Sequence, residues 1–307
     1  DIGLYMTHFY QWKQNSLQGG LRVDSRKIKT EGYVDEHDGE VHVIPALDKS
    51  YEQITASLGL KTLLAGNIIT RLNIASGFRA PTLAELTSDG VHHGSNRFEE
   101  GNPNLKSEKN YQIDVALEYP SDHIELYANG FYNHIDNYIF ISPTEEMEDG
   151  FPVFEYVQDN SKLYGGEFGL HFHPHPLDWL HFNSSYELVI GEQNNGDFLP
   201  LIPAHQWSNK LRTELKNGDI KDPFITLGYV HTFAQNKVSM FETPSSSYVI
   251  WNFGIGGKIN SGKVQFDLSA HVNNIADKKY ISHLSRLKPN GIYNIGRNFM
   301  AKLKLSI

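Results

Sequence analysis

Residues 110–119, NYQIDVALEY, decide the fold because apolar and polar positions alternate along them with a period of two. Tyr111, Ile113, Val115, Leu117 and Tyr119 fall on one side of an extended chain, and the residues between them fall on the other. An amphipathic helix would instead space its apolar residues three or four apart. The same alternation recurs at 180–190, 264–272 and 299–307. These stretches predict β-strands with one apolar and one polar face.

The composition excludes several classes of protein. The 307 residues carry a formal net charge of −9, which argues against a nucleic-acid partner. The chain has no cysteine, and so no disulfide framework, thiolate metal site or cysteine nucleophile. No apolar run approaches the roughly 18 residues that a membrane-spanning helix needs. A membrane β-barrel stays possible, because its strands alternate and need no long apolar block.

The whole chain divides into about thirteen predicted strands. They are expected at 3–12, 15–25, 53–63, 67–77, 110–119, 123–138, 153–172, 178–190, 205–216, 222–233, 247–259, 263–275 and 291–307. Short connections, at 65–66, 120–122, 174–176, 217–219 and 260–262, alternate with long ones near 26–52, 78–109, 139–152, 191–204, 234–246 and 276–290. Short turns on one rim and long loops on the other are typical of an outer-membrane barrel, whereas a soluble sandwich has no reason to keep that alternation. The predicted fold class is therefore all-β, a transmembrane antiparallel β-barrel with its apolar face toward lipid.

Three motifs resemble the barrel of TonB-dependent outer-membrane receptors. The first is GFRAPTLAEL at 77–86, followed by GNPNLKSE at 101–108. The second is LRVD at 21–24, and the third is NNIADKKY at 273–280 followed by GRNF at 296–299. Their order and spacing match the family over nearly the whole chain. One departure is the last residue, Ile307, where the family usually ends on an aromatic side chain.

The resemblance implies the extent and the activity of the chain. An odd strand count and the lack of a plug domain predict that residues 1–307 are a single-domain fragment, the C-terminal portion of a barrel of about 22 strands. The implied activity is import of a metal chelate or metal, such as a ferric siderophore, haem or zinc, across the outer membrane of a Gram-negative bacterium. The implied partners are the TonB energy-transducing complex, acting through the plug, the barrel-assembly machinery, outer-membrane lipid and lipopolysaccharide, and a small metal-containing ligand. No covalent cofactor is expected. The alternative is a passive porin-like channel of about twelve to fourteen strands.

The most pointed site candidate is GVHHG at 90–94, inside the long loop at 78–109. His92 and His93, with Glu99 and Glu100 nearby, offer imidazole and carboxylate ligands for Zn²⁺, Cu²⁺ or haem iron. A histidine at this point of the loop also resembles zinc-type members of the family. The alternative is a polar loop that packs on its neighbours.

Two further groups of histidines are candidates of lower interest. DEHDGEVH at 35–42 brings His37 and His42 among acidic residues in an early loop, either as metal ligands or as a solvated hairpin tip. His173 and the neighbouring His175 fall in a predicted short turn, which favours a structural role, while His171 and His181 fall on positions facing the barrel interior.

No catalytic function is predicted. The chain has no nucleophile elbow, no phosphate-binding glycine loop and no zincin helix. The glycine pair at 165–166 lies in a strand and lacks the strand–turn–helix context of a nucleotide loop. An enzyme is therefore not expected.

Overall fold

One long antiparallel sheet dominates the computed structural model, which describes residues 1–307 apart from 38–39, 45, 93, 216–219, 263 and 307. Thirteen strands follow one another in the sheet, in chain order. They are β1 (Ile2–Trp12), β2 (Asn15–Thr30), β5 (Leu47–Leu64), β6 (Ile68–Arg79), β9 (Glu108–Tyr119), β10 (Ile124–Glu148), β11 (Phe151–Phe172), β12 (Leu180–Gln193), β13 (Gln206–Glu214), β14 (Lys221–Thr232), β15 (Tyr248–Ser261), β16 (Val264–Asn273) and β17 (Asn298–Ser306). Each of the thirteen predicted strands is thereby confirmed, as is the antiparallel all-β class.

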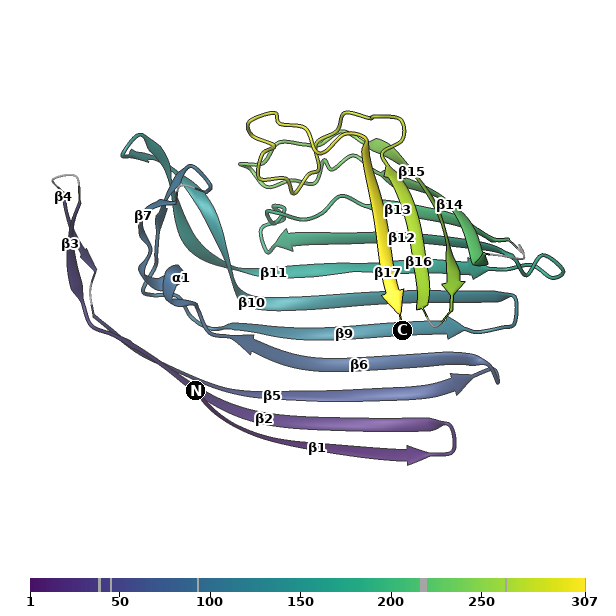
Figure 1. Ribbon diagram of the computed structural model, residues 1–307. Coiled ribbons are helices and arrows are strands. Elements are labelled where there is room, and N and C mark those ends of the chain that lie inside the picture. The colour runs from purple at the N-terminus through teal and green to yellow at the C-terminus, as the bar shows by residue number, and fades with distance from the viewer. Residues whose placement is uncertain (38–39, 45, 93, 216–219, 263, 307) are drawn as a thin grey trace.

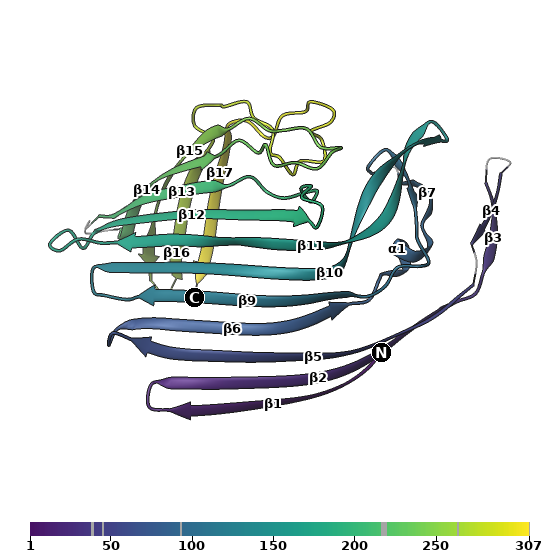
Figure 2. The same ribbon diagram turned by 180° about the vertical axis from the view of Figure 1, so that it is seen from behind.

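The sheet curves into a trough with β1 and β17 at its two edges (Figures 1 and 2). Among the described residues, β1 pairs with β2 and β17 pairs with β16, so the sheet is open. The tight turns gather at one end of the strands and the long connections at the other, which we call the short-turn rim and the long-loop rim. The total of about 22 strands stays a prediction.

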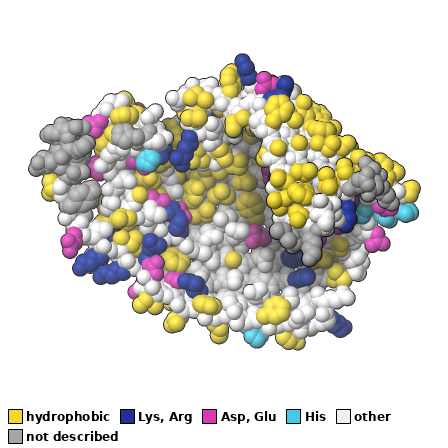
Figure 3. All heavy atoms as spheres, in the orientation of Figure 1, with side chains coloured by type: hydrophobic (Ala, Val, Ile, Leu, Met, Phe, Trp, Pro, Cys, Tyr) yellow, Lys and Arg dark blue, Asp and Glu magenta, His cyan; other side chains and the backbone are white. Residues whose placement is uncertain are grey.

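In β9 the apolar face of the strand is its more exposed face, which is the reverse of a water-soluble sheet. In β9 the apolar residues Tyr111 to Leu117 are exposed, whereas the polar residues between them are half-buried on the concave side. Tyr111 is 51% exposed. Figure 3 shows apolar side chains gathered over the front of β17 and its neighbours. Exposing so much contiguous apolar surface to water would be unfavourable, and a lipid environment removes that penalty.

The long loops at the long-loop rim are folded and packed. Residues 80–107 contain α1 (Leu83–Thr87), β7 (Asp89–His92) and β8 (Arg97–Glu100), and a separate hairpin is formed by β3 (Tyr33–His37) and β4 (Glu40–Ile44). Helix α1 starts with a capping box, in which Thr82 and Glu85 each bond the other's backbone N–H. No helix in the described part of the chain is long and apolar enough to cross a membrane.

A buried cluster of Leu47, Leu86, Leu105 and Ile139 holds this rim together, with Ile28 and Tyr156 packed against it. These residues come from β5, α1, the segment before β9, and the outer part of β10. Packing of residues so distant in the sequence gives the loops a core of their own. We call this packed region, residues 80–107 with the outer parts of β10 and β11, the loop lobe.

Three expected boundaries are wrong. The predicted long loop at 26–52 is partly strand, because β2 continues to Thr30 and pairs there with β5, which begins at Leu47. The predicted long loop at 139–152 is mostly strand, because β10 continues to Glu148 and pairs with β11 across a tight turn at Asp149 and Gly150. The last strand begins at Asn298 and not near 291, because residues before it are held in a loop by bonds to Tyr280 and Asp277. All three differences depend on hydrogen-bond partners, which the alternation of apolar and polar residues alone does not reveal.

Candidate functional site

The β7–β8 hairpin, which carries the predicted metal ligands, docks on the extended end of β11. Strand β8 pairs with β11 in parallel, with Phe98 opposite Val153 and Glu100 opposite Glu155. Phe98 and Val153 are both 2% exposed. The hairpin is therefore anchored to the loop lobe by a ladder and by buried apolar side chains, so its polar side chains have defined positions.

His92 is an exposed residue at the end of β7, opposite Arg97 in β8. The Oγ of Ser95 lies 3.2 Å from Nδ1 of His92. Among the described residues, this contact leaves Nε2 of His92 as the nitrogen open to a ligand. An imidazole held at one nitrogen and exposed at the other is suited to bind a metal or a haem iron.

Glu99 and Glu100 differ in what they can offer. Glu99 is buried, and its carboxylate accepts hydrogen bonds from Nε of Arg97 at 2.8 Å and from the hydroxyl of Tyr156 at 3.0 Å. Burial alone would raise the pKa of Glu99, but these hydrogen bonds outweigh it and hold the pKa below its usual value. Glu99 is thus an anchoring carboxylate of the hairpin, whereas Glu100 is exposed.

The other predicted ligands cannot be placed as side chains. His93 lies outside the described residues. The backbone pairs His37 with Glu40 and Asp35 with His42 in the β3–β4 hairpin, but the side chains of His37 and His42 are also outside the described part of the chain. The metal assignments at His92, His93, His37 and His42 stay predictions.

Arg79 fastens the start of the loop lobe to the barrel wall. Its guanidinium donates to both oxygens of Glu85, at 2.9 and 2.8 Å, and to both oxygens of Glu108, at 2.8 and 2.7 Å. Such fork-shaped pairing fixes the planar group in one orientation. The arrangement gives Arg79 a structural role where the long loop begins.

A buried imidazole joins two other long loops, and the sequence analysis missed it. His283, in the connection between β16 and β17, is 7% exposed, and its Nδ1 lies 2.9 Å from the Oγ of Ser245 and 3.1 Å from Nζ of Lys288. Glu242 lies 3.8 Å from the other ring nitrogen. Burial and the nearby Lys288 lower the pKa of His283, and burial lowers the pKa of Lys288. The signal available in the sequence was weak: a single histidine between Ser282 and Leu284.

The concave face offers a polar groove between β10 and β16. Its lining includes charged, amide and phenol side chains, among them Glu125, Tyr127, Asn183, Lys210, Arg212 and Asn252. Figure 3 shows the molecule hollowed in its middle, where the two sides of the trough face each other. Charged and amide side chains thus line part of the inner face, whereas the exposed side chains of β9 from Tyr111 to Leu117 on the outer face are apolar.

Comparison with known proteins agrees with this architecture. A hemin receptor of Yersinia enterocolitica is 25% identical over 313 residues, covering 92% of this chain and 41% of that protein. The copper transporter OprC superposes with a TM-score of 0.81 at 19% identity, covering 98% of this chain and 47% of that one. The FrpB iron transporter from Neisseria meningitidis gives a TM-score of 0.67 at 17% identity, covering 99% and 44%. The chain spans less than half the length of these relatives, and each of them is named a receptor or a transporter.

The family assignment comes from the sequence of the barrel wall itself. The family model described as TonB dependent receptor-like, beta-barrel matches residues 1–275, which include β1 to β16 and the loop lobe. With the match extending over most of its length, the chain belongs to the TonB-dependent receptor β-barrel family.

Proposed function

We propose that this chain forms part of the wall and the ligand-capturing loops of an outer-membrane receptor that imports a metal chelate or a metal ion. The observation that carries the proposal is the family match over residues 1–275. The reversed burial of the strands supports a lipid-facing outer surface, and the packed loop lobe supports a preorganised binding rim. The long-loop rim then faces the exterior and the short-turn rim the periplasm.

The chemical class of the ligand follows from the relatives and from the loop lobe. The relatives are named for hemin, copper and iron, so the shared chemistry is a transition metal or its chelate. His92 offers an exposed imidazole nitrogen, which is a ligand for iron, copper and zinc alike. In this proposal His92 contacts the metal or chelate, while Arg97 and Glu99 hold the hairpin that presents it.

The transport step depends on groups beyond the barrel wall. We propose that a plug domain fills the polar groove of the concave face, and that the TonB complex acts on this plug to release the ligand inward. Barrel-assembly machinery, lipid and lipopolysaccharide complete the expected partners.

The test is uptake by cells that lack their own receptor and express this one. Growth under iron, haem, zinc or copper limitation identifies the ligand, and deletion of TonB is expected to abolish the uptake. His92→Ala is expected to weaken ligand binding without lowering the amount of folded receptor, whereas His175→Ala, on the other rim, leaves binding unchanged. Uptake that persists without TonB, together with free passage of small sugars, would show a passive channel and contradict the proposal.

A further inference from the structure

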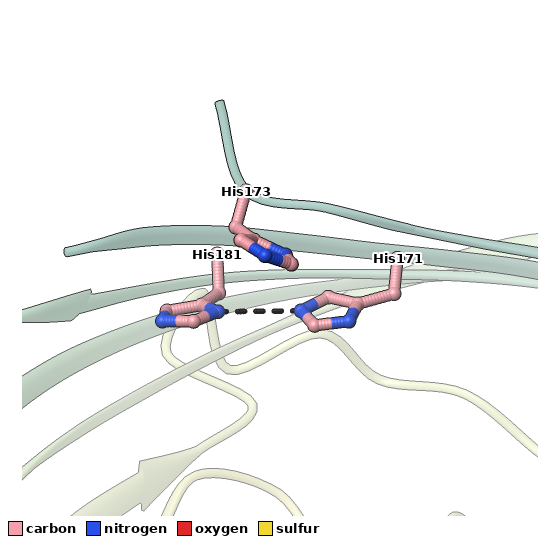
Figure 4. A group of neighbouring side chains, drawn as sticks. All are labelled: His171, His173 and His181. Carbon is pink, nitrogen blue, oxygen red and sulfur yellow. Dashed lines mark hydrogen bonds between the residues drawn. The ribbon is translucent and has the colours of Figure 1, made fainter. Parts of the chain in front are cut away.

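Three histidines meet on the concave face at the short-turn rim. Each of His171, His173 and His181 offers one ring nitrogen, and the three nitrogens lie within 4.8 Å of one another. Nε2 of His171 is 3.2 Å from Nδ1 of His181. Figure 4 shows these two rings meeting edge to edge, with the ring of His173 above them. In Figure 3 imidazoles gather at the right-hand end of the molecule, over the short turns.

The ladder between β11 and β12 explains why these residues meet. His171 pairs with Asn183 and Phe172 with Phe182, so the next pair outward on the same register joins His173 and His181. Residues two apart on a strand share a face, which places His171 and His173 on one side of the sheet. On the other side of β11, the N–H of His173 donates to the carbonyl oxygen of His123 at 3.0 Å, which ties the turn to the start of β10.

The surroundings of the cluster match those of a metal site. Oε2 of Glu125, directly opposite His171 in the β10–β11 ladder, lies 3.5 Å from Nδ1 of His171. Metal-binding histidines commonly contact a carboxylate through their second nitrogen, which fixes the orientation of the ring. In addition, Nδ1 of His173 is buried and has no hydrogen-bond partner among the described residues. A buried polar atom without a partner is costly, and a bound cation would satisfy it.

We propose that His171, His173 and His181 form a binding site for a divalent transition-metal ion of the zinc class. Zinc–nitrogen bonds of about 2.0–2.1 Å in a tetrahedron place two ligand nitrogens roughly 3.3 Å apart. The His171–His181 nitrogens already have this separation, and a ring nitrogen of His173 lies within 4.8 Å of the other two ligand atoms. Three imidazoles leave the fourth position to water or to a passing ligand, so the ion is held exchangeably.

Nearby cations do not oppose the ion. Arg212 lies opposite His181 in the β12–β13 ladder, but its guanidinium is bound to Glu214 at 3.1 Å and stacked on Phe224 at 4.1 Å. Glu125 adds a negative charge beside His171. The site lies at the opposite rim from His92, so it is independent of the proposed capture of ligand by the loop lobe, and it stands whichever metal or chelate the receptor imports.

The experiment is zinc titration by calorimetry on the purified receptor in detergent and metal-free buffer. The receptor carries His92→Ala as a background change, so that the imidazole of His92 does not contribute. We expect one zinc ion per chain, with affinity lowered at least tenfold by His173→Ala or His181→Ala and about tenfold by Glu125→Gln. Cobalt(II) added in place of zinc is expected to give the absorption bands of a four-coordinate nitrogen-rich site.

His175→Ala is the matched control, because His175 lies in the same turn, is exposed and pairs with Asp178 at 3.3 Å outside the cluster. It is expected to leave both the affinity and the cobalt spectrum unchanged. His173 lies outside the strands, so its replacement leaves the β11–β12 ladder intact even if His181→Ala impairs folding. Zinc binding unchanged in His173→Ala, equal losses in His175→Ala, or no zinc bound at all would overturn the proposal. Uptake assays fail or succeed separately, so a wrong import function would leave these results standing.

Discussion

Replacing Leu86 by alanine tests whether the loop lobe is a folded unit with its own core. Leu86 is 1% exposed and packs in α1 against Leu47, Leu105 and Ile139. A buried leucine replaced by alanine loses its transfer free energy and leaves a cavity, at a typical cost of about 3 kcal/mol. The cluster draws on four separate segments, so the cavity cannot close by moving one of them, and the full cost is expected.

Leu86→Ala should lower the free energy of local opening of the loop lobe and leave the stability of the barrel wall unchanged. The cluster joins the lobe to the wall through Leu47 of β5, whereas the wall itself is held by continuous ladders between neighbouring strands. A loss of ~3 kcal/mol makes the open lobe on the order of 100-fold more populated. Hydrogen exchange of peptides covering residues 83–105 measures this population directly, and peptides from β14 to β16 report the wall.

Leu83→Ala is the control, because Leu83 lies on the same helix, undergoes the same chemical change and is 48% exposed. Its replacement is expected to change the opening free energy of the lobe, measured by hydrogen exchange, by less than about 0.5 kcal/mol. Ligand affinity should fall in Leu86→Ala and hold in Leu83→Ala if capture needs a preformed lobe. Equal protection of residues 83–105 in the wild type and in Leu86→Ala would refute the reasoning, because the cluster would then contribute nothing to the order of the loops.

Three other predictions concern the polar anchors and the wall. Arg79→Ala leaves the mostly buried Glu108 and Glu85 without their cation. It is expected to lower the free energy of opening of the loop lobe by about 2 kcal/mol, after discounting for the partial exposure of Arg79. Hydrogen exchange should show that Arg79→Lys recovers only part of this loss, because lysine lacks the planar fork that binds both carboxylates. Because the pKa of His283 is lowered, the native loops bind fewer protons at this ring than the opened loops do. The contribution of His283 to the loop contact is therefore fully present above about pH 6.5 and is lost below it. Exchange at residues 235–245, corrected for intrinsic rates, should show this loss below about pH 6.5, and His283→Asn should remove it. A Cβ on Gly165 would collide with the carbonyl oxygen of Leu188, so Gly165→Ala should reduce the heat-resistant folded fraction on gels, whereas Gly130→Ala, with its nearest neighbour at 3.9 Å, should not.

The strands could be predicted because their signal is local. A residue such as Ile113 or Leu268 is apolar between polar neighbours whatever lies far away in the sequence, and that pattern is enough to place a strand and its lipid face. The boundaries at 139–152 and 291 failed because they depend on partners. Strand β10 continues past Ile139 only because β11 offers a ladder, and residues 294–297 stay in a loop because Asp277 accepts the N–H of Arg297 at 2.8 Å.

The candidate site was harder to predict from the sequence, because its contacts also depend on partners that are distant in the sequence. The loop carrying His92 was found from its composition, but the attachment of Glu99 to Tyr156, 57 positions later, depends on the parallel pairing of β8 with β11. The burial of His283 likewise arises from Ser245 in another loop. Neither contact has a periodic signal, because each joins loops whose relative placement is set by packing.

The histidine cluster is partly predictable: the facing of its strand residues follows from local alternation, but their meeting depends on the pairing of two strands. Alternation placed His171 and His181 on the inner face, while the intervening prolines favoured a purely structural turn at His173. Once one pair of the β11–β12 ladder is known, every other pair follows, because an antiparallel register is constant between bulges. The register sets His173 beside His181 and His171 one step inward on the same face. One known residue pair between β11 and β12 therefore predicts a three-imidazole cluster at a turn that the sequence alone presents as structural. The other residue pairs can be derived in the same way for any hairpin whose register is fixed by its lipid face.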